Sequence, residues 1–97
     1  MPRSALERRL FENNDRLKRL RADLSVAREQ VAFLDAEADD ARLRALVSET
    51  PITDAEAREA QRHADAQRQQ LEQLAGSIAE LEREQDALLD RMTAELT

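Results

Sequence analysis

The chain contains no cysteine, tryptophan or tyrosine, and its 97 residues include only two phenylalanines, two prolines and one glycine. The absence of cysteine excludes disulfide bonds and thiolate chemistry. Strand proteins need aromatic and β-branched residues together with frequent turn residues, so this composition argues against a β-sheet. A thick globular core is not expected either, because so few side chains are large.

Long apolar runs are also missing. No segment approaches the roughly 20 apolar residues that cross a bilayer, and the first residues, MPRSALERRL, lack the apolar core of a secretory signal. We therefore expect a cytoplasmic protein. The richness in alanine, arginine and aspartate is typical of a bacterium with a GC-rich genome.

Two long segments with a seven-residue repeat of apolar residues make up most of the chain, and 37% of all residues are charged. Such a composition is typical of coiled coils. The repeats predict a single domain over residues 1–97, with helices at about 5–47 and 54–94 and a bend at 48–53. Pro51 disfavours helix at Thr50, and Thr53 followed by Glu56 predicts a capping box for the second helix.

The repeat defines one seam on each predicted helix. On the first helix the seam residues are Leu6, Leu10, Asn13, Leu17, Leu20, Leu24, Ala27, Val31, Leu34, Ala38, Ala41 and Ala45. On the second they are Ala57, Ala60, Ala64, Gln67, Leu71, Leu74, Ile78, Leu81, Gln85, Leu88, Met92 and Glu95. A short connection joins antiparallel neighbours, so the predicted fold is all-α: a two-helix antiparallel coiled-coil hairpin.

The register that matches the two seams best is centred on Glu49 and opposes Leu10 to Leu88. It also opposes the two interior amides, Asn13 and Gln85, which we expect to form a hydrogen-bonded register pair. Among the charges flanking the seam, this register predicts ion pairs of Arg16 with Glu84 and of Glu37 with His63.

A second apolar stripe is predicted on the side of the first helix that faces away from the seam, with further apolar residues at the bend. The candidate interface residues are Val26, Phe33, Ala36, Leu43, Leu46, Val47 and Ile52. A helix that is apolar on two faces is usually packed on both. We therefore expect a homodimer in which the first helices pack together into a four-helix bundle, the alternative being a docking surface for another protein.

Residues suited to catalysis are scarce. His63 is the only histidine, no ligand set with metal spacing surrounds it, and no glycine-rich loop could hold a phosphate. We expect no enzyme activity, no cofactor and no metal. The net charge of −6 argues against direct binding of nucleic acid, and the acids on the polar face of the first helix argue against a membrane-lying helix. The expected function is that of a non-catalytic coiled-coil interaction or scaffold protein.

Three acids lie at the predicted tip of the hairpin: Glu49, Asp54 and Glu56. A coiled-coil hairpin with acids at its tip resembles the arm of Gre-type transcript cleavage factors and of DksA-type regulators. The resemblance implies an arm that enters the secondary channel of RNA polymerase and brings the tip carboxylates near the catalytic magnesium. The second domain of Gre factors and the zinc-binding cysteines of DksA proteins have no counterpart here. An RNA polymerase-binding transcription regulator is the alternative function.

Overall fold

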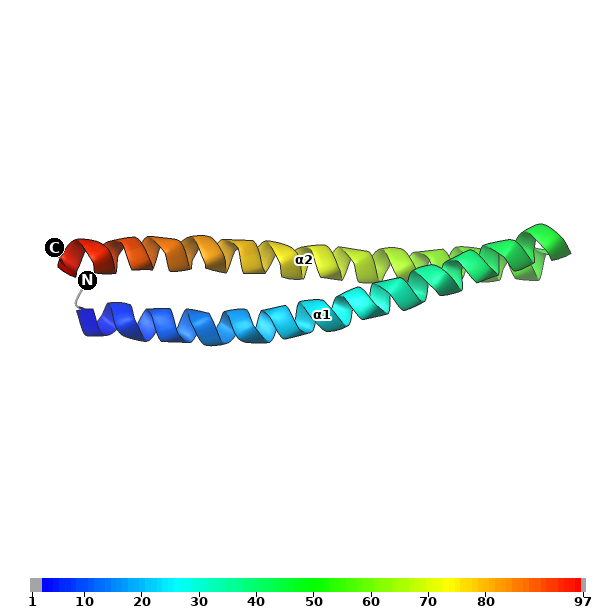
Figure 1. Ribbon diagram of the computed structural model, residues 1–97. Coiled ribbons are helices and arrows are strands. Elements are labelled where there is room, and N and C mark those ends of the chain that lie inside the picture. The colour runs from blue at the N-terminus through cyan, green and yellow to red at the C-terminus, as the bar shows by residue number, and fades with distance from the viewer. Residues whose placement is uncertain (1–2, 97) are drawn as a thin grey trace. The chain divides into compact units, whose positions relative to one another are not determined.

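The computed structural model describes residues 3–96, and all but two of them are helical. Helix α1 runs from Arg3 to Ser48 and helix α2 from Pro51 to Leu96, with no strand in the described range (Figure 1). The predicted all-α class and the two long helices are confirmed. The bend is shorter than predicted, because it consists of Glu49 and Thr50 rather than residues 48–53.

Helix α1 ends through a residue in the left-handed conformation. Glu49 has a φ of 50°, and its N–H donates to the carbonyl oxygen of Ala45 at 2.9 Å. A left-handed residue after the last helical turn is a common helix terminator, usually a glycine. Here the chain uses a glutamate, which has a Cβ and is strained in this region.

Helix α2 begins with a cap from Thr50. The Thr53 N–H donates to Thr50 Oγ1 at 3.2 Å, and the Thr50 N–H donates to Thr53 Oγ1 at 3.3 Å. Pro51 occupies the first helical position, where a missing N–H matters least. The capping box predicted from Thr53 and Glu56 is therefore wrong. The helix begins at Pro51 instead of after it, and Thr53 is the residue that bonds back to the capping residue Thr50.

The left-handed Glu49 gives a testable prediction. Glu49→Gly should raise the free energy of unfolding by about 0.5–1 kcal/mol, since glycine adopts this conformation without strain, whereas Glu49→Ala should change it by less than about 0.5 kcal/mol. Chemical denaturation followed by circular dichroism measures both. The control is Ala55→Gly, an exposed position inside α2, which should lower stability. A destabilised Glu49→Gly variant would contradict the left-handed assignment.

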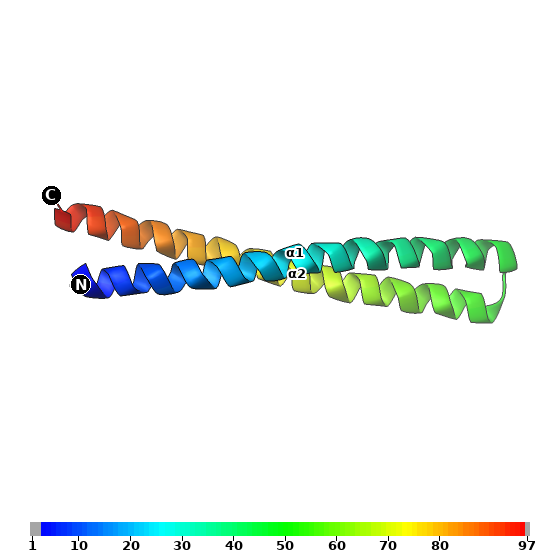
Figure 2. The ribbon, with the colours of Figure 1, turned by 60° about the horizontal axis from the view of Figure 1, so that its bottom comes forward.

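The described chain forms two compact units. Unit 1 pairs residues 3–24 of α1 with residues 74–96 of α2, and unit 2 consists of residues 25–73 and carries the bend. In each unit the α1 and α2 segments run antiparallel, and unit 2 is by itself a helical hairpin (Figure 2).

The seams make the core of both units. In unit 1 the buried apolar side chains are Leu6, Leu17, Leu24, Ile78, Leu81 and Leu88, and in unit 2 they are Ala27, Ala38, Ala41 and Ala64. Every predicted seam residue of α1 is buried or half-buried, and so is every one of α2 except the exposed Glu95. The seven-residue repeat therefore identified the buried faces correctly.

Cross-helix polar contacts agree with a register centred on Glu49. In unit 1 Gln85 Nε2 donates to the Leu10 carbonyl oxygen at 3.4 Å, and in unit 2 Gln67 Nε2 donates to Gln30 Oε1 at 2.8 Å. Each of these pairs lies nearly symmetrically about Glu49. The predicted register is consistent with both.

Gly76 lies within α2, and a Cβ added there would meet no atom within 4 Å. Because glycine is about 1 kcal/mol worse than alanine inside a helix, Gly76→Ala should raise the free energy of unfolding by about that amount. Thermal unfolding followed by circular dichroism tests this. The control is the reverse change at the neighbouring exposed Ala75: Ala75→Gly should lower the free energy of unfolding by a similar amount. A neutral or harmful Gly76→Ala would mean that the glycine serves something other than the helix.

Candidate interaction surface

The predicted stripe on α1 is exposed in unit 2. The fractional exposures are 53% for Val26, 64% for Phe33 and 60% for Leu43, and Ala36 is exposed as well. We call these four residues the α1 stripe. They follow helical spacing on the face opposite the seam, so α1 is apolar on two faces, whereas the apolar residues of α2 concentrate on one.

Three further candidate interface residues lie around the bend of unit 2. Leu46 and Val47 are in the last turn of α1, Ile52 is in the first turn of α2, and all three are exposed. Val47 has the largest exposed fraction of the exposed large apolar residues, 85%. Large apolar side chains gathered at one end of a unit are typical of a contact surface rather than of scattered surface residues.

A shallow groove of about 420 Å³ lies beside Phe33. Phe33 and Leu34 form its apolar part, and the amides of Gln30 and Gln67 border it. Those amides are bonded to each other across the two helices, so the border of the groove is a fixed polar contact. The α1 stripe is therefore not flat, and a side chain of a partner could occupy the groove beside Phe33.

Two carboxylates interrupt the α1 stripe. Glu29 and Asp40 occur on the same helical face and are exposed, and within residues 3–96 neither forms an ion pair. Two nearby arginines are engaged elsewhere: Arg42 bonds Asp39, and Arg68 of α2 bonds Asp35. The stripe is therefore apolar and carries two carboxylates that form no ion pair within residues 3–96.

The tip acids Glu49, Asp54 and Glu56 are all exposed in unit 2. Asp54 lies in the first turn of α2, where the helix dipole favours a negative charge. No group of three or more acids, histidines or cysteines suited to holding a metal ion occurs among the described residues. The helix dipole thus accounts for Asp54 without a ligand.

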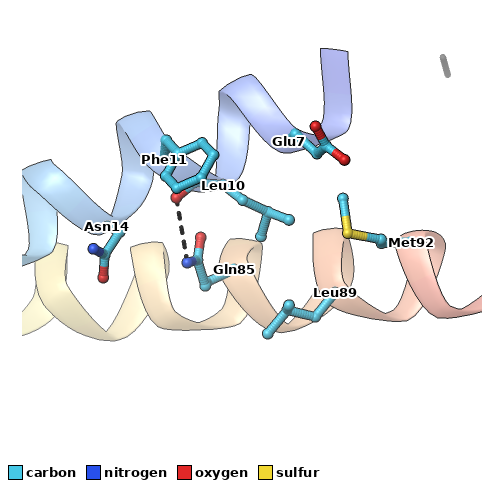
Figure 3. Close-up of a pocket in the computed structure, with 7 residues that line it drawn as sticks. All are labelled: Glu7, Leu10, Phe11, Asn14, Gln85, Leu89 and Met92. Carbon is cyan, nitrogen blue, oxygen red and sulfur yellow. Dashed lines mark hydrogen bonds between the residues drawn. The ribbon is translucent and has the colours of Figure 1, made fainter. Parts of the chain in front are cut away.

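The register pair lies inside unit 1, but the predicted hydrogen bond between the two amides is not formed. Asn13 is 6% exposed, and its Nδ2 forms no hydrogen bond of ordinary geometry, although the Asn13 side chain lies near enough to Glu84 to contribute to the lowered pKa of that carboxyl. Gln85 uses its Nε2 on the Leu10 carbonyl, which leaves its own Oε1 buried and unpaired (Figure 3). A donor and an acceptor are thus both unsatisfied in one part of the core, and this costs about 1–3 kcal/mol for each group.

Surface charges pair differently from the sequence-based expectation. Arg9, rather than Arg16, bonds Glu84, and this hydrogen bond is the main reason why the pKa of Glu84 is lowered. His63 contacts Glu59 one turn away at 3.2 Å rather than Glu37. The pKa of Glu59 is lowered mainly by its hydrogen bond from Arg62. Long side chains reach several neighbours, so opposed positions alone do not fix the partner.

Sequence reasoning missed a second apolar surface, which lies on unit 1. Leu10, Phe11, Leu89 and Met92 line a groove of about 510 Å³, with Phe11 72% exposed and Leu89 48% exposed (Figure 3). Phe11 and Leu89 each follow a seam residue directly, at positions that the repeat assigns to the flank. The double leucine at 88–89 was the available signal.

Neither described helix contains a stretch both long and apolar enough to cross a membrane. In comparisons with known proteins, no family model matches the chain, and neither a curated protein nor a solved structure shows a significant match.

Proposed function

We propose that the protein is a non-catalytic, cytoplasmic interaction or scaffold protein that forms a homodimer through the α1 stripe. The observation that carries this proposal is the row of exposed Val26, Phe33 and Leu43 on the face of α1 opposite the seam. Packing the stripes of two copies against each other would place four helices in one bundle.

Energetics support association through this face. Full burial of a large apolar side chain contributes about 1.5–3 kcal/mol, and roughly half of that for Val26, Phe33 and Leu43, which are little more than half exposed. A two-fold contact buries these three side chains in both copies. The sum is comparable with the association cost of about 4–15 kcal/mol. Closed two-fold pairing is the commonest way in which a protein covers such a surface.

The direct test is sedimentation equilibrium of the unmodified protein from micromolar to millimolar concentration. A mass that rises from 11.1 kDa toward twice that value is expected. A single species at the monomer mass over the whole concentration range would contradict the homodimer, and the α1 stripe would then be a surface for a different protein.

The tip acids support the second candidate, an RNA polymerase-binding regulator, because all three are exposed together at the bend. We expect the triple variant Glu49→Gln, Asp54→Asn, Glu56→Gln to self-associate as the unmodified protein does. Transcription assays with purified polymerase separate the two functions. If the protein alters transcription and this folded variant does not, the regulator is the better description and the scaffold proposal fails.

A further inference from the structure

The α1 stripe matches itself under a two-fold rotation. When two copies of α1 are laid antiparallel about the midpoint between Leu34 and Asp35, Phe33 of each copy faces Ala36 of the other. The same arrangement opposes Val26 to Leu43. The largest side chain thus meets the smallest, as good packing of facing helices requires.

This pairing also opposes the two carboxylates that interrupt the stripe. Glu29 and Asp40 are symmetric about the same midpoint, so each would face the other across the contact, twice per dimer. Within residues 3–96 neither carboxylate forms an ion pair, and two nearby arginines are bonded to other acids: Arg42 to Asp39, and Arg68 of α2 to Asp35. Like charges brought together at a partly desolvated contact repel and weaken it.

We infer that a second copy docks antiparallel on the α1 stripe with Glu29 facing Asp40, and that repulsion between these two carboxylates limits the strength of the dimer. The inference rests on the proposed homodimer and adds its register and the residues that control its affinity. A partner protein with a basic helix is the competing occupant.

A charge series at these two positions tests the pairing, with dimer dissociation constants measured by sedimentation. Glu29→Lys turns repulsion into attraction and should tighten the dimer by about tenfold or more. Glu29→Lys combined with Asp40→Lys restores repulsion, now between two cations, and should return the constant toward that of the unmodified protein. Glu29→Gln combined with Asp40→Asn should lie between these extremes.

The salt dependence of the dimer dissociation constant gives an independent test of this repulsion. Raising sodium chloride from about 0.05 to about 0.5 M screens charges at the contact, so it should tighten the unmodified dimer and loosen the Glu29→Lys dimer. The control is Glu56→Lys, which changes the net charge equally at an exposed site on α2 and should leave the constant nearly unchanged. Circular dichroism confirms that each variant is folded.

The outcomes separate the two proposals. If the double lysine variant dimerises more tightly than Glu29→Lys, net charge alone governs association and the facing of Glu29 and Asp40 is wrong. If the unmodified protein dimerises and all variants of the series have the same dimer dissociation constant, the proposed register is wrong, while the homodimer is retained. If every folded variant is monomeric at millimolar concentration, both proposals fail and a basic helix from another protein becomes the occupant to test.

Discussion

Replacing both Asn13 and Gln85 with leucine should raise the free energy of unfolding by about 2–4 kcal/mol. The change removes an unpaired Nδ2 and an unpaired Oε1 from the core of unit 1, and buried polar groups exchanged together for apolar ones of similar size are often stabilising by this amount. In a chain of this length the melting temperature should rise by about 10 °C or more. Thermal unfolding at a fixed protein concentration measures it.

The single variants and one neighbour supply the controls. Each single replacement leaves the other amide unpaired, so each should stabilise less than the double variant. Asn14→Leu changes an exposed amide and should alter stability by less than about 0.5 kcal/mol. A double variant that melts below either single variant would contradict a shared layer. Broadened NMR spectra of the double variant would indicate that the amides fix the register.

Phe33→Glu combined with Leu43→Glu should convert the protein into a folded monomer. Both side chains are exposed in unit 2, so the substitutions leave the seam intact while placing four additional charges in the proposed dimer contact. Burial of unpaired charge is strongly unfavourable, and the dissociation constant should rise by at least about a thousandfold. Sedimentation equilibrium gives the mass, and the melting temperature should no longer depend on concentration.

Phe11→Glu is the matched control, because it changes the other exposed phenylalanine, which lies on unit 1. It should leave self-association through the α1 stripe intact. If Phe11→Glu produces the monomer and the unit 2 variant does not, copies meet through the groove of Leu10, Leu89 and Met92 instead. This pair of variants therefore locates the contact as well as testing it.

The seam was predictable because its signal is periodic and repeated over many turns: Leu17, Leu24 and Leu81 are buried where the repeat puts them. The ends of the helices were less predictable, because Pro51 disfavours helix before it yet is well suited to start one. A periodic reading carries no information on which of these roles the residue takes.

Polar contacts were harder to predict than apolar ones. Spacing opposed Asn13 to Gln85, but the Gln85 amide reaches the Leu10 carbonyl instead. Such a choice depends on side-chain torsions, which no residue spacing encodes. The exposed Phe11 was missed for a related reason, since a residue beside the seam is covered or exposed according to small rotations of its helix.

The two-residue connection at Glu49 and Thr50 also has a kinetic consequence. Contacts in unit 2 join residues 33 and 37 positions apart, as in Arg68 with Asp35 and Gln67 with Gln30, whereas Arg9 and Glu84 of unit 1 are 75 positions apart. Closing a short loop loses less chain entropy than closing a long one, so pairing should begin at the bend and proceed outward. Substitutions in unit 2 should then mainly slow folding, while those in unit 1, including the leucine pair, should mainly change the unfolding rate.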